Sequence, residues 1–281
     1  MSFGTLLVAT RSILSEFSAA RSSAKTIPGR HVKSFAFNLC LVANGIRAGF
    51  LLDTFTPPNP LELFFSLLQA LHQALPEFGR VLHIHDELSN QAFFVNTALL
   101  QKNRKDARIL GGGLTEEVMR VASDSWIDYV ILETPPVLMT RPPELQQIWD
   151  HIIGNFTRNP STRVIQIPSE LTSGREHLLI PLAAFFLEYP VGYVPLDANQ
   201  ATFLNHIPLD VYECVLQDWG EERTLLKFSC PQCVSQSVAR LSPDEVCRRL
   251  VGRFQPRLRA ADPSWRLKVL HTQETLPRVS L

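Results

Sequence analysis

Five short apolar stretches constrain the fold of this chain more than any other feature of its sequence. Each ends in an acid, a glycine cluster or a proline, and a segment with helical periodicity usually follows. The stretches are GFLLDTF (49–55), RVLHIHD (80–86), ARILGGG (107–113), DYVILETPP (128–136) and RVIQIPS (163–169). Apolar strands that alternate with helices are typical of a buried parallel sheet. We therefore predict an α/β fold with a mostly parallel central sheet and helices on both of its faces.

The pattern changes in the last third of the chain. Two strand-like runs, 209–216 and 223–228, flank the turn sequence DWGE and predict an antiparallel hairpin. A helix over 243–259 and a strand over 265–271 follow. We expect this hairpin, helix and strand to be added to the α/β fold at its C-terminal end. After the second apolar stretch the sequence predicts a helix over 88–101. The third stretch contains a predicted strand over 107–110, and a helix over 115–123 follows it.

Length and composition favour one folded domain. The chain has 281 residues, of which 45% are hydrophobic and 19% charged, so it can bury a large core. We predict a single α/β domain over 1–281. It would comprise N-terminal helices at 1–46, a βα core at 47–200 and a C-terminal ββαβ portion at 205–272.

The charge balance and the cysteines limit the classes of partner and compartment. Lys and Arg number 27, as do Asp and Glu, so no net field draws the chain to nucleic acid or to an anionic membrane. The five cysteines are too few and too dispersed for a disulfide scaffold. No apolar run reaches the roughly 20 residues that span a bilayer. We expect a soluble, intracellular, cytoplasmic protein without membrane contact, for which a nucleic-acid partner is disfavoured.

The N-terminal segment leaves a second compartment open. Residues 1–35 hold five basic side chains and one acid, Glu16, and their apolar residues fall on one helical face. This composition resembles a mitochondrial presequence. The alternative, which we favour, is that the segment is the first helix of the domain and packs on its core.

Three acids mark the edge where ligands bind in open α/β sheets. Asp53, Asp86 and Glu133 each lie at the carboxyl end of a predicted strand. Converging carboxylates would hold Mg²⁺ or share general acid and base roles, so these residues are the candidate catalytic groups. The alternative is that each acid caps backbone amides in the turn that follows its strand.

Two other motifs resemble ligand sites. His83 and His85 would point to the same face of one strand, as metal ligands do, but a third ligand is missing from the pattern, and we favour two core histidines. The glycines 111–113 lie between a strand and a helix, yet they match neither the dinucleotide fingerprint nor the P-loop. We therefore predict neither a metal site nor a cofactor-binding site, and the cofactor, if there is one, stays unknown.

Cysteines and arginines near the C-terminus form two further patterns. Cys230 and Cys233 make a single C-x-x-C, for which Cys247 and His271 are the only nearby additional zinc ligands, so zinc or redox chemistry is disfavoured. Five arginines on the predicted helix 243–259 would suit an acidic partner or phosphates. A solvated outer face is the alternative that we favour. The arginines are Arg248, Arg249, Arg253, Arg257 and Arg259.

Three stretches carry a resemblance to a known family. They are LLVATRSILSEF (6–17), EYPVGYVPLD (188–197) and IPLDVYECVL (207–216). Together they resemble an uncharacterised animal protein family typified by the chromosome 1 open reading frame 74 protein. The resemblance implies a single-domain intracellular protein. It implies no activity and gives no residue a role.

Three hypotheses for the function follow, in this order. The first is a protein that acts through protein contacts, with the proline-rich loops 56–60 and 135–143 as recognition surfaces. The second is a metal-assisted hydrolase or transferase that uses the strand-end acids. The third is a module that binds an acidic partner or nucleic acid through the arginine helix. Whether the protein is an enzyme is left open by the sequence.

Overall fold

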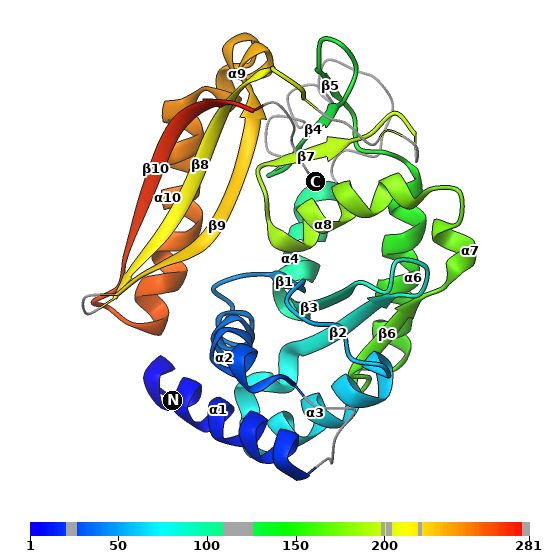
Figure 1. Cartoon of the computed structure of the whole chain (residues 1–281), viewed down its shortest axis with the longest axis vertical. Coiled ribbons are helices and arrows are strands. Elements are labelled where there is room, and N and C mark those ends of the chain that lie inside the picture. Colours follow the sequence, from blue (N-terminus) through cyan, green and yellow to red (C-terminus); the bar gives the residue numbers. More distant parts are fainter. Residues whose placement is uncertain (21–26, 109–125, 198–199, 201–203, 219–220, 277–281) are drawn as a thin grey trace. The chain divides into compact units, whose positions relative to one another are not determined.

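The structure, a computed structural model of the chain, describes residues 1–20, 27–108, 126–197, 200, 204–218 and 221–276 (Figure 1). The chain divides into two compact units. The first comprises Met1–Gln101 and Pro143–Ser173, and the second comprises Lys102–Pro142 and Gly174–Leu281. The predicted core at 47–200 thus contributes to both units. The prediction of one domain over 1–281 stays a prediction.

The first unit alternates helices and strands and forms one four-stranded sheet. Its elements are α1 (Phe3–Ala20), α2 (Gly29–Ala43), β1 (Gly49–Leu52), α3 (Pro60–Ala74), a 3₁₀ turn (Pro76–Arg80), β2 (Val81–Asp86), β3 (Ala92–Asn96), the start of α4 (Thr97–Arg108), α6 (Glu144–Arg158), β6 (Val164–Ile167) and α7 (Ser169–Thr172). The strand order is β1-β3-β2-β6. β3 runs antiparallel to both β1 and β2, whereas β6 is parallel to β2.

The α/β class is confirmed, but the prediction of a mostly parallel sheet is wrong, because the sheets are mixed. The error lies at 88–101, which was predicted as a helix and contains strand β3 followed by the start of α4. Phe93, Phe94 and Val95 are aromatic or β-branched and suit a strand better than a helix. Asn90, in the left-handed region at φ 57°, turns the chain between β2 and β3. The resulting hairpin places an antiparallel strand between β1 and β2.

Aromatic rings form the core on one face of this sheet. Phe94 of β3 stacks on Phe50 of β1, with ring centroids 5.2 Å apart. Phe35 of α2 and Phe64 of α3 meet Phe94 edge-on, at 5.4 and 5.0 Å. Such edge-to-face pairs stabilise a core beyond the area that they bury. The register places His83 of β2 beside Phe94, so α2 and α3 cover the face on which His83 lies.

The N-terminal helix belongs to this core. α1 packs on α2 and also contacts α3. Leu6, Thr10 and Leu14 of α1 are fully buried, and the ring of Phe3 lies 5.7 Å from that of Phe37 in α2. The favoured expectation for the segment 1–35, a first helix packed on the core, is confirmed for the described residues. The compartment is not determined by this packing.

The second unit contains two three-stranded sheets. Its elements are β4 (Asp128–Ile131), β5 (Val137–Met139), a 3₁₀ turn (Glu176–Leu178), α8 (Leu179–Leu187), β7 (Val191–Val194), β8 (Pro208–Asp218), β9 (Glu221–Pro231), α9 (Gln232–Ser237), a 3₁₀ turn (Ala239–Leu241), α10 (Pro243–Ala261) and β10 (Arg266–Thr275). One sheet has the order β5-β4-β7 and the other β10-β8-β9. The predicted antiparallel hairpin is confirmed as the pair β8–β9.

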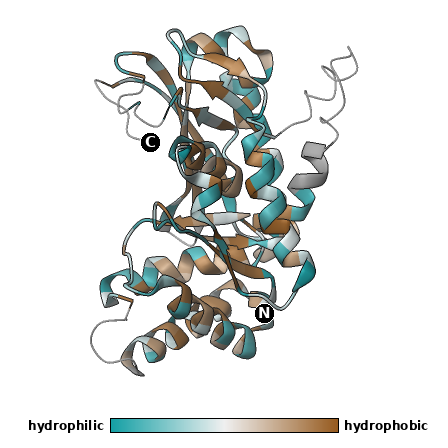
Figure 2. Cartoon of the chain, turned by 90° about the vertical axis from the view of Figure 1, so that its right-hand side faces the viewer, coloured by the Kyte–Doolittle hydropathy of each residue, from teal (hydrophilic) through white to brown (hydrophobic). Residues whose placement is uncertain are grey.

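Several helices of both units carry hydrophobic and hydrophilic stripes along their lengths (Figure 2), whereas α8 is apolar throughout. None of the described helices is both long enough and apolar enough to cross a membrane. The predicted helix 115–123 and the glycines 111–113 lie outside the described residues. Of the predicted strand 107–110, the first two residues end α4 and the others also lie outside the described residues.

Candidate functional site

The three strand-end acids are divided between the units. Asp53 follows β1 and Asp86 ends β2 in the first unit, whereas Glu133 follows β4 in the second. β1 and β2 point the same way but are separated by β3, so Asp53 and Asp86 are about 10 Å apart along the edge at the usual strand spacing. Asp53 and Glu133 are exposed. A shared catalytic site of these three acids stays a prediction.

Asp86 is buried and holds the turn after β2. Its Oδ2 accepts hydrogen bonds from the backbone N–H and the hydroxyl of Ser89, both at 2.7 Å. Its Oδ1 is buried and has no partner among the described residues. These contacts support the alternative role, in which the acid caps a turn.

His83 and His85 lie in the covered face of the sheet. His83 is fully buried, stacks on Phe94 at 5.2 Å and has no hydrogen-bond partner for either ring nitrogen among the described residues. Burial, reinforced by His85, lowers the pKa of His83 well below its ordinary value, so the ring is neutral. Burial also lowers the pKa of His85, although Asp86 and Glu87 partly offset this effect. The packing of His83 supports its favoured assignment as a core histidine.

Within the part of the chain that the structure describes, no three His, Cys, Asp or Glu side chains converge to hold a metal ion. Cys230 ends β9 in the interior, and burial raises the pKa of its thiol. Cys233 is exposed, and its Sγ lies 3.9 Å from the carbonyl oxygen of Pro136. His271 hydrogen-bonds to Asp210 through its Nε2 atom.

Three of the five arginines of α10 are bound inside the second unit rather than presented to solvent. Arg253 and Arg257 pair with Glu188, which is fully buried at the C-terminus of α8. The closest approaches are 2.5 Å from Arg253 Nη2 to Oε1 and 2.7 Å from Arg257 Nη1 to Oε2. Burial by itself raises the pKa of Glu188, but the two guanidinium groups outweigh it and lower the pKa to about 2.

Arg249 joins the same network through Trp126 and Asp128. Its Nη2 donates to the Trp126 carbonyl at 2.7 Å, and its Nη1 lies 3.6 Å from Asp128 Oδ2. Arg240 binds the other oxygen of Asp128 at 2.5 Å. The Trp126 ring packs under Arg253, with the guanidinium carbon 4.2 Å from the ring centroid.

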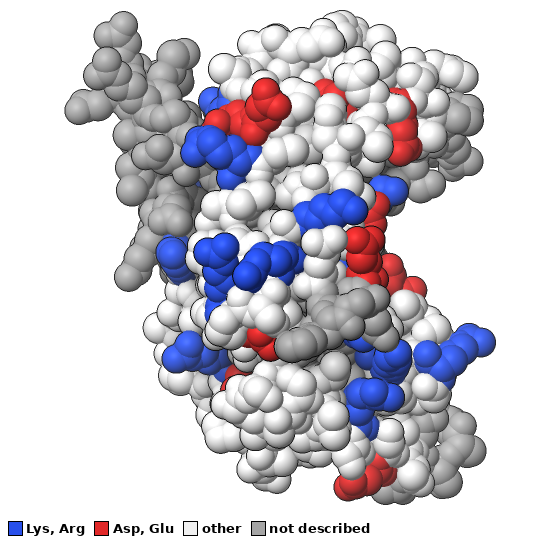
Figure 3. All heavy atoms as spheres, turned by 90° about the vertical axis from the view of Figure 1, so that its left-hand side faces the viewer, with Lys and Arg blue, Asp and Glu red and all other residues white. Residues whose placement is uncertain are grey.

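The favoured expectation of a solvated arginine face is therefore wrong for Arg249, Arg253 and Arg257. Of the other two arginines, Arg248 pairs with Glu245 on the same helix and Arg259 is exposed. The partners were not evident from sequence because Asp128 and Glu188 lie more than 60 residues before the arginines that bind them. Basic side chains on the face shown in Figure 3 are interspersed with acids. This arrangement removes the main support for a nucleic-acid module.

Another buried carboxylate, which the sequence patterns missed, lies in the sheet β10-β8-β9. Asp210 is 2% exposed and accepts a hydrogen bond from Ser235 Oγ at 2.5 Å. His271 Nε2 lies 2.8 Å from its other oxygen, to which Gln273 also donates at 3.4 Å. The serine contacts the acid and not the histidine, so this is not a nucleophile–base arrangement. The cluster ties α9 and β10 to β8.

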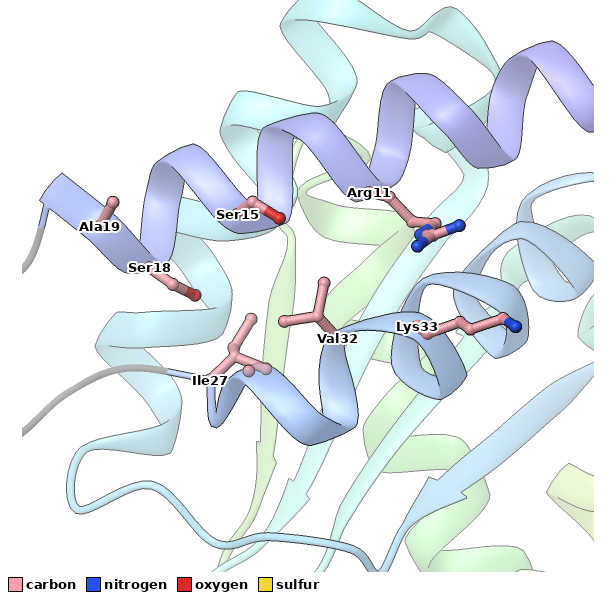
Figure 4. Close-up of a pocket in the computed structure, with 8 residues that line it drawn as sticks. Arg11, Ser15, Ser18, Ala19, Ile27, Val32 and Lys33 are labelled. Atoms are coloured by element: carbon pink, nitrogen blue, oxygen red, sulfur yellow. The ribbon is translucent and has the colours of Figure 1, made fainter.

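A cavity of about 460 Å³ lies between α1 and α2 in the first unit (Figure 4). Two stripes line it, one on each helix. α1 contributes Arg11, Ser15, Ser18 and Ala19, and the second stripe is Ile27, Gly29, Val32 and Lys33. The spacings 11, 15, 18, 19 and 29, 32, 33 place each set on one face of its helix. Arg11, Ser15, Ala19 and Lys33 are exposed, so the cavity is open to solvent.

The charge in this cavity is of one sign. Arg11 and Lys33 have no ion pair or hydrogen bond with any described residue, and no carboxylate is among the described residues that line the cavity. The acid of α1, Glu16, accepts a hydrogen bond from Ser12 instead. Ser18 Oγ is buried and has no partner in the described part of the chain. The first turn of α2 contains no acid and no side chain caps it.

Two of the basic residues in the segment 1–35, Arg11 and Lys33, line this cavity. The composition of that segment also resembles a presequence, which is a different interpretation of the same residues. The periodicity within each helix was visible, whereas the pairing of the two helices was not. Only when α1 packs against α2 do the two cations line the same cavity.

Comparison with known proteins gives no match to a family model, to a curated protein or to a solved structure. The family resemblance of 6–17, 188–197 and 207–216 therefore stays a prediction. The contacts of the described residues are the basis on which a function is assigned.

Proposed function

We propose that the protein binds a small ligand that carries a phosphate group in the cavity between α1 and α2. The observation that carries this proposal is that Arg11 and Lys33 line one cavity of about 460 Å³ without a carboxylate among the lining residues. Guanidinium and ammonium groups are the side chains that bind phosphate in proteins, the first by paired hydrogen bonds and the second as a point charge.

The electrostatics of the empty cavity favour an anion. The two like charges gain no compensating partner within the described protein, so an anion placed between them interacts favourably with both. Ser15 and Ser18 add hydroxyl donors on the same wall. The uncapped first turn of α2 contributes a partial positive charge at Gly29. Each charge-assisted hydrogen bond contributes about 1.5–3 kcal/mol.

The side chains in the cavity support binding rather than catalysis. Neither serine has a histidine or a carboxylate in contact that would activate its hydroxyl as a nucleophile. Arg11 and Lys33 supply charge and hydrogen-bond donors to a ligand. The role that follows is that of a ligand-binding protein.

The other hypotheses have less support. The arginine network with Glu188 and Asp128 uses the side chains that a nucleic-acid module would need. Asp86 holds the turn after β2, and joint chemistry of Asp53, Asp86 and Glu133 stays a prediction. Action through protein contacts stays a prediction, as does membership of the family that the sequence resembles.

Isothermal titration calorimetry of the full chain with inorganic phosphate at low ionic strength tests the proposal. We expect saturable binding that Arg11→Gln and Lys33→Gln each weaken about tenfold, the equivalent of ~1.4 kcal/mol. The matched control is Arg30→Gln, which removes the same charge from α2 at a residue that does not line the cavity. It should change the affinity less than twofold.

Two results would overturn the proposal. One is the absence of any heat of binding for the native chain up to about 10 mM phosphate, well above the range of specific small-ligand affinities. The other is an equal loss of affinity in Arg30→Gln and Lys33→Gln, which would assign the binding to diffuse surface charge.

A further inference from the structure

The strand β10 forms one edge of the sheet β10-β8-β9 in the second unit (Figure 1). Its ten residues pair with β8 without a register shift, from Arg266 opposite Gln217 to Thr275 opposite Pro208. No described strand pairs with the other side of β10. The strand contains neither a proline nor a bulge, two of the features by which proteins protect such edges. Its outer edge is therefore able to accept a further strand.

Contacts at the two ends of β10 show which of its backbone groups point away from β8. The side chain of Gln255 in α10 accepts a hydrogen bond from the N–H of Leu267 at 2.9 Å and donates to the carbonyl of Trp265 at 3.0 Å. At the other end, the carbonyl of Leu276 accepts from the N–H of His206, two residues before β8, at 2.9 Å. Because successive residues of a strand direct their N–H and C=O groups to opposite sides, the odd-numbered residues of β10 direct theirs outward.

The free part of the edge lies in the second half of the strand. The amide of Gln255 bonds to the start of the edge as a residue of a neighbouring strand would. Beyond it, the outward N–H and C=O groups of Val269, His271 and Gln273 have no hydrogen-bond partner among the described residues. These three residues offer a row of donors and acceptors to an extended chain.

We infer that β10 pairs with β10 of a second copy of this chain, antiparallel and about a two-fold axis at His271. In this register His271 pairs with its own copy, and Val269 pairs with Gln273 on either side of the axis. These three pairs use the free backbone groups and end before Leu267, whose N–H is bound to Gln255. The two sheets join into one continuous sheet. This surface is independent of the cavity between α1 and α2.

The charges of β10 favour this partner and this register. Lys268 and Glu274 lie on the same face of the strand, and charged side chains on an edge discourage pairing with a chain that does not match them. The axis at His271 places Lys268 of each copy opposite Glu274 of the other, in pairs where cross-strand side chains are closest. Lys268 at present lies 3.6 Å from Glu222, in an exposed pair that contributes little to stability.

The neighbouring registers fit less well. An axis one residue earlier pairs Leu267 with Gln273, although the N–H of Leu267 is already bound to Gln255. An axis one residue later places Lys268 opposite the apolar Leu276, so its charge gains no counter-charge. An axis between two residues pairs outward groups with inward ones and forms no ladder. The register about His271 satisfies both the backbone and the charges.

Sedimentation equilibrium of the full chain at physiological ionic strength, from about 1 to about 200 µM, tests the inference. We expect a monomer–dimer equilibrium with a dissociation constant in the micromolar range, because a single pair of strands makes a smaller interface than the standard size. A chain that stays monomeric over this whole range would overturn the inference.

A charge exchange tests the register. Lys268→Glu and Glu274→Lys should each weaken the dimer about tenfold, because each places like charges opposite one another in both symmetric pairs. An equimolar mixture of the two variants should associate with native affinity, since unlike charges then face each other in both pairs. The matched control Arg266→Glu makes the same change of charge opposite an uncharged residue and should weaken the dimer less than about threefold.

Two results of the charge exchange would overturn the proposed pairing. One is a mixture of Lys268→Glu and Glu274→Lys that does not associate. The other is an effect of Arg266→Glu equal to that of Lys268→Glu, which would assign the association to diffuse charge.

Val269→Pro separates pairing through the backbone from contact through side chains. Proline removes the outward N–H of this residue and leaves the bonds to β8 intact, since these come from the even-numbered residues. We expect a folded monomer for Val269→Pro and a dimer for the control Val269→Ala, which keeps the N–H. Circular dichroism shows that each variant is folded. A dimer of native affinity in Val269→Pro would overturn the inference.

Discussion

At the scale of single residues, Glu188 is a buried carboxylate that is paired with two arginines. It is fully buried and has a left-handed backbone conformation at φ 58°. The two arginines that bind it, both in α10, lie more than 60 residues later in the chain. Breaking a buried ion pair by removing one partner leaves the other charge uncompensated, which is more costly than the pair is favourable. The integrity of the second unit should therefore depend on this carboxylate.

Glu188→Gln is expected to lower the free energy of unfolding by about 3–5 kcal/mol, because Arg253 and Arg257 stay buried without a counter-charge. Urea denaturation followed by circular dichroism measures the change. The matched control is Glu245→Gln, which removes the carboxylate from the exposed pair with Arg248 and should leave the midpoint unchanged. Equal effects of the two substitutions would contradict the assignment of Glu188 as a buried counter-ion.

The same residue predicts how stability depends on pH. The pKa of Glu188 falls from 4.5 to about 2 on folding, so its contribution is fully present above pH 4.5 and is lost as the pH falls toward 2. A shift of this size corresponds to about 3 kcal/mol. Urea midpoints of the native chain and of Glu188→Gln should therefore converge between pH 5 and about pH 2. A gap between them that stays constant over that range would show that the carboxylate is not the titrating group.

At the scale of elements, the packing of α1 makes the N-terminal segment part of the fold. The side chain of Leu14 in α1 is fully buried, whereas that of Val8 on the same helix is 67% exposed. Leu14→Ala should cost about 2–5 kcal/mol of stability, the usual range for a buried leucine. Val8→Ala should change stability by less than about 0.5 kcal/mol. If chemical denaturation shows no loss for Leu14→Ala, α1 is not part of the core and the cavity beside it does not exist in solution.

The β2–β3 hairpin depends on one turn residue. Asn90 is exposed and has φ 57°, a conformation that Asn and Gly adopt readily and β-branched residues do not. Asn90→Val should destabilise the first unit by about 1–2 kcal/mol, whereas Asn90→Gly should be nearly neutral. Thermal melting of the two variants makes the comparison, and identical melting temperatures would contradict this turn geometry.

Local sequence signals located elements better than they located contacts between elements. The strand-like runs 209–216 and 223–228 predicted the hairpin β8–β9 correctly. The helical prediction for 88–101 failed because the periodicity of a short apolar run does not distinguish a buried strand from a buried helix, although the residue types Phe93, Phe94 and Val95 favour a strand. No sequence pattern pointed to the ion pairs of Glu188, since its two arginines come from a distant helix. Contacts between residues far apart in the sequence therefore determine what local patterns do not predict.

At the scale of the whole molecule, the equal numbers of acids and bases leave local pairing to determine the electrostatics. With 27 of each sign the formal net charge is zero, and Glu188 and Asp128 are each paired with two arginines. Arg11 and Lys33 differ because they face a cavity and have no ion pair within the described chain. At physiological ionic strength, charges beyond about 8 Å are largely screened, so this local pair dominates what an anion encounters there. The central claim is that the two cations form a phosphate site.

A crystal structure of the chain soaked with tungstate, a heavy analogue of phosphate, tests that claim most directly. We predict an anomalous peak between the guanidinium group of Arg11 and the ammonium group of Lys33, and its loss in crystals of Lys33→Gln. An empty cavity in crystals whose tungstate binds elsewhere, or a peak that persists in Lys33→Gln, would contradict the claim.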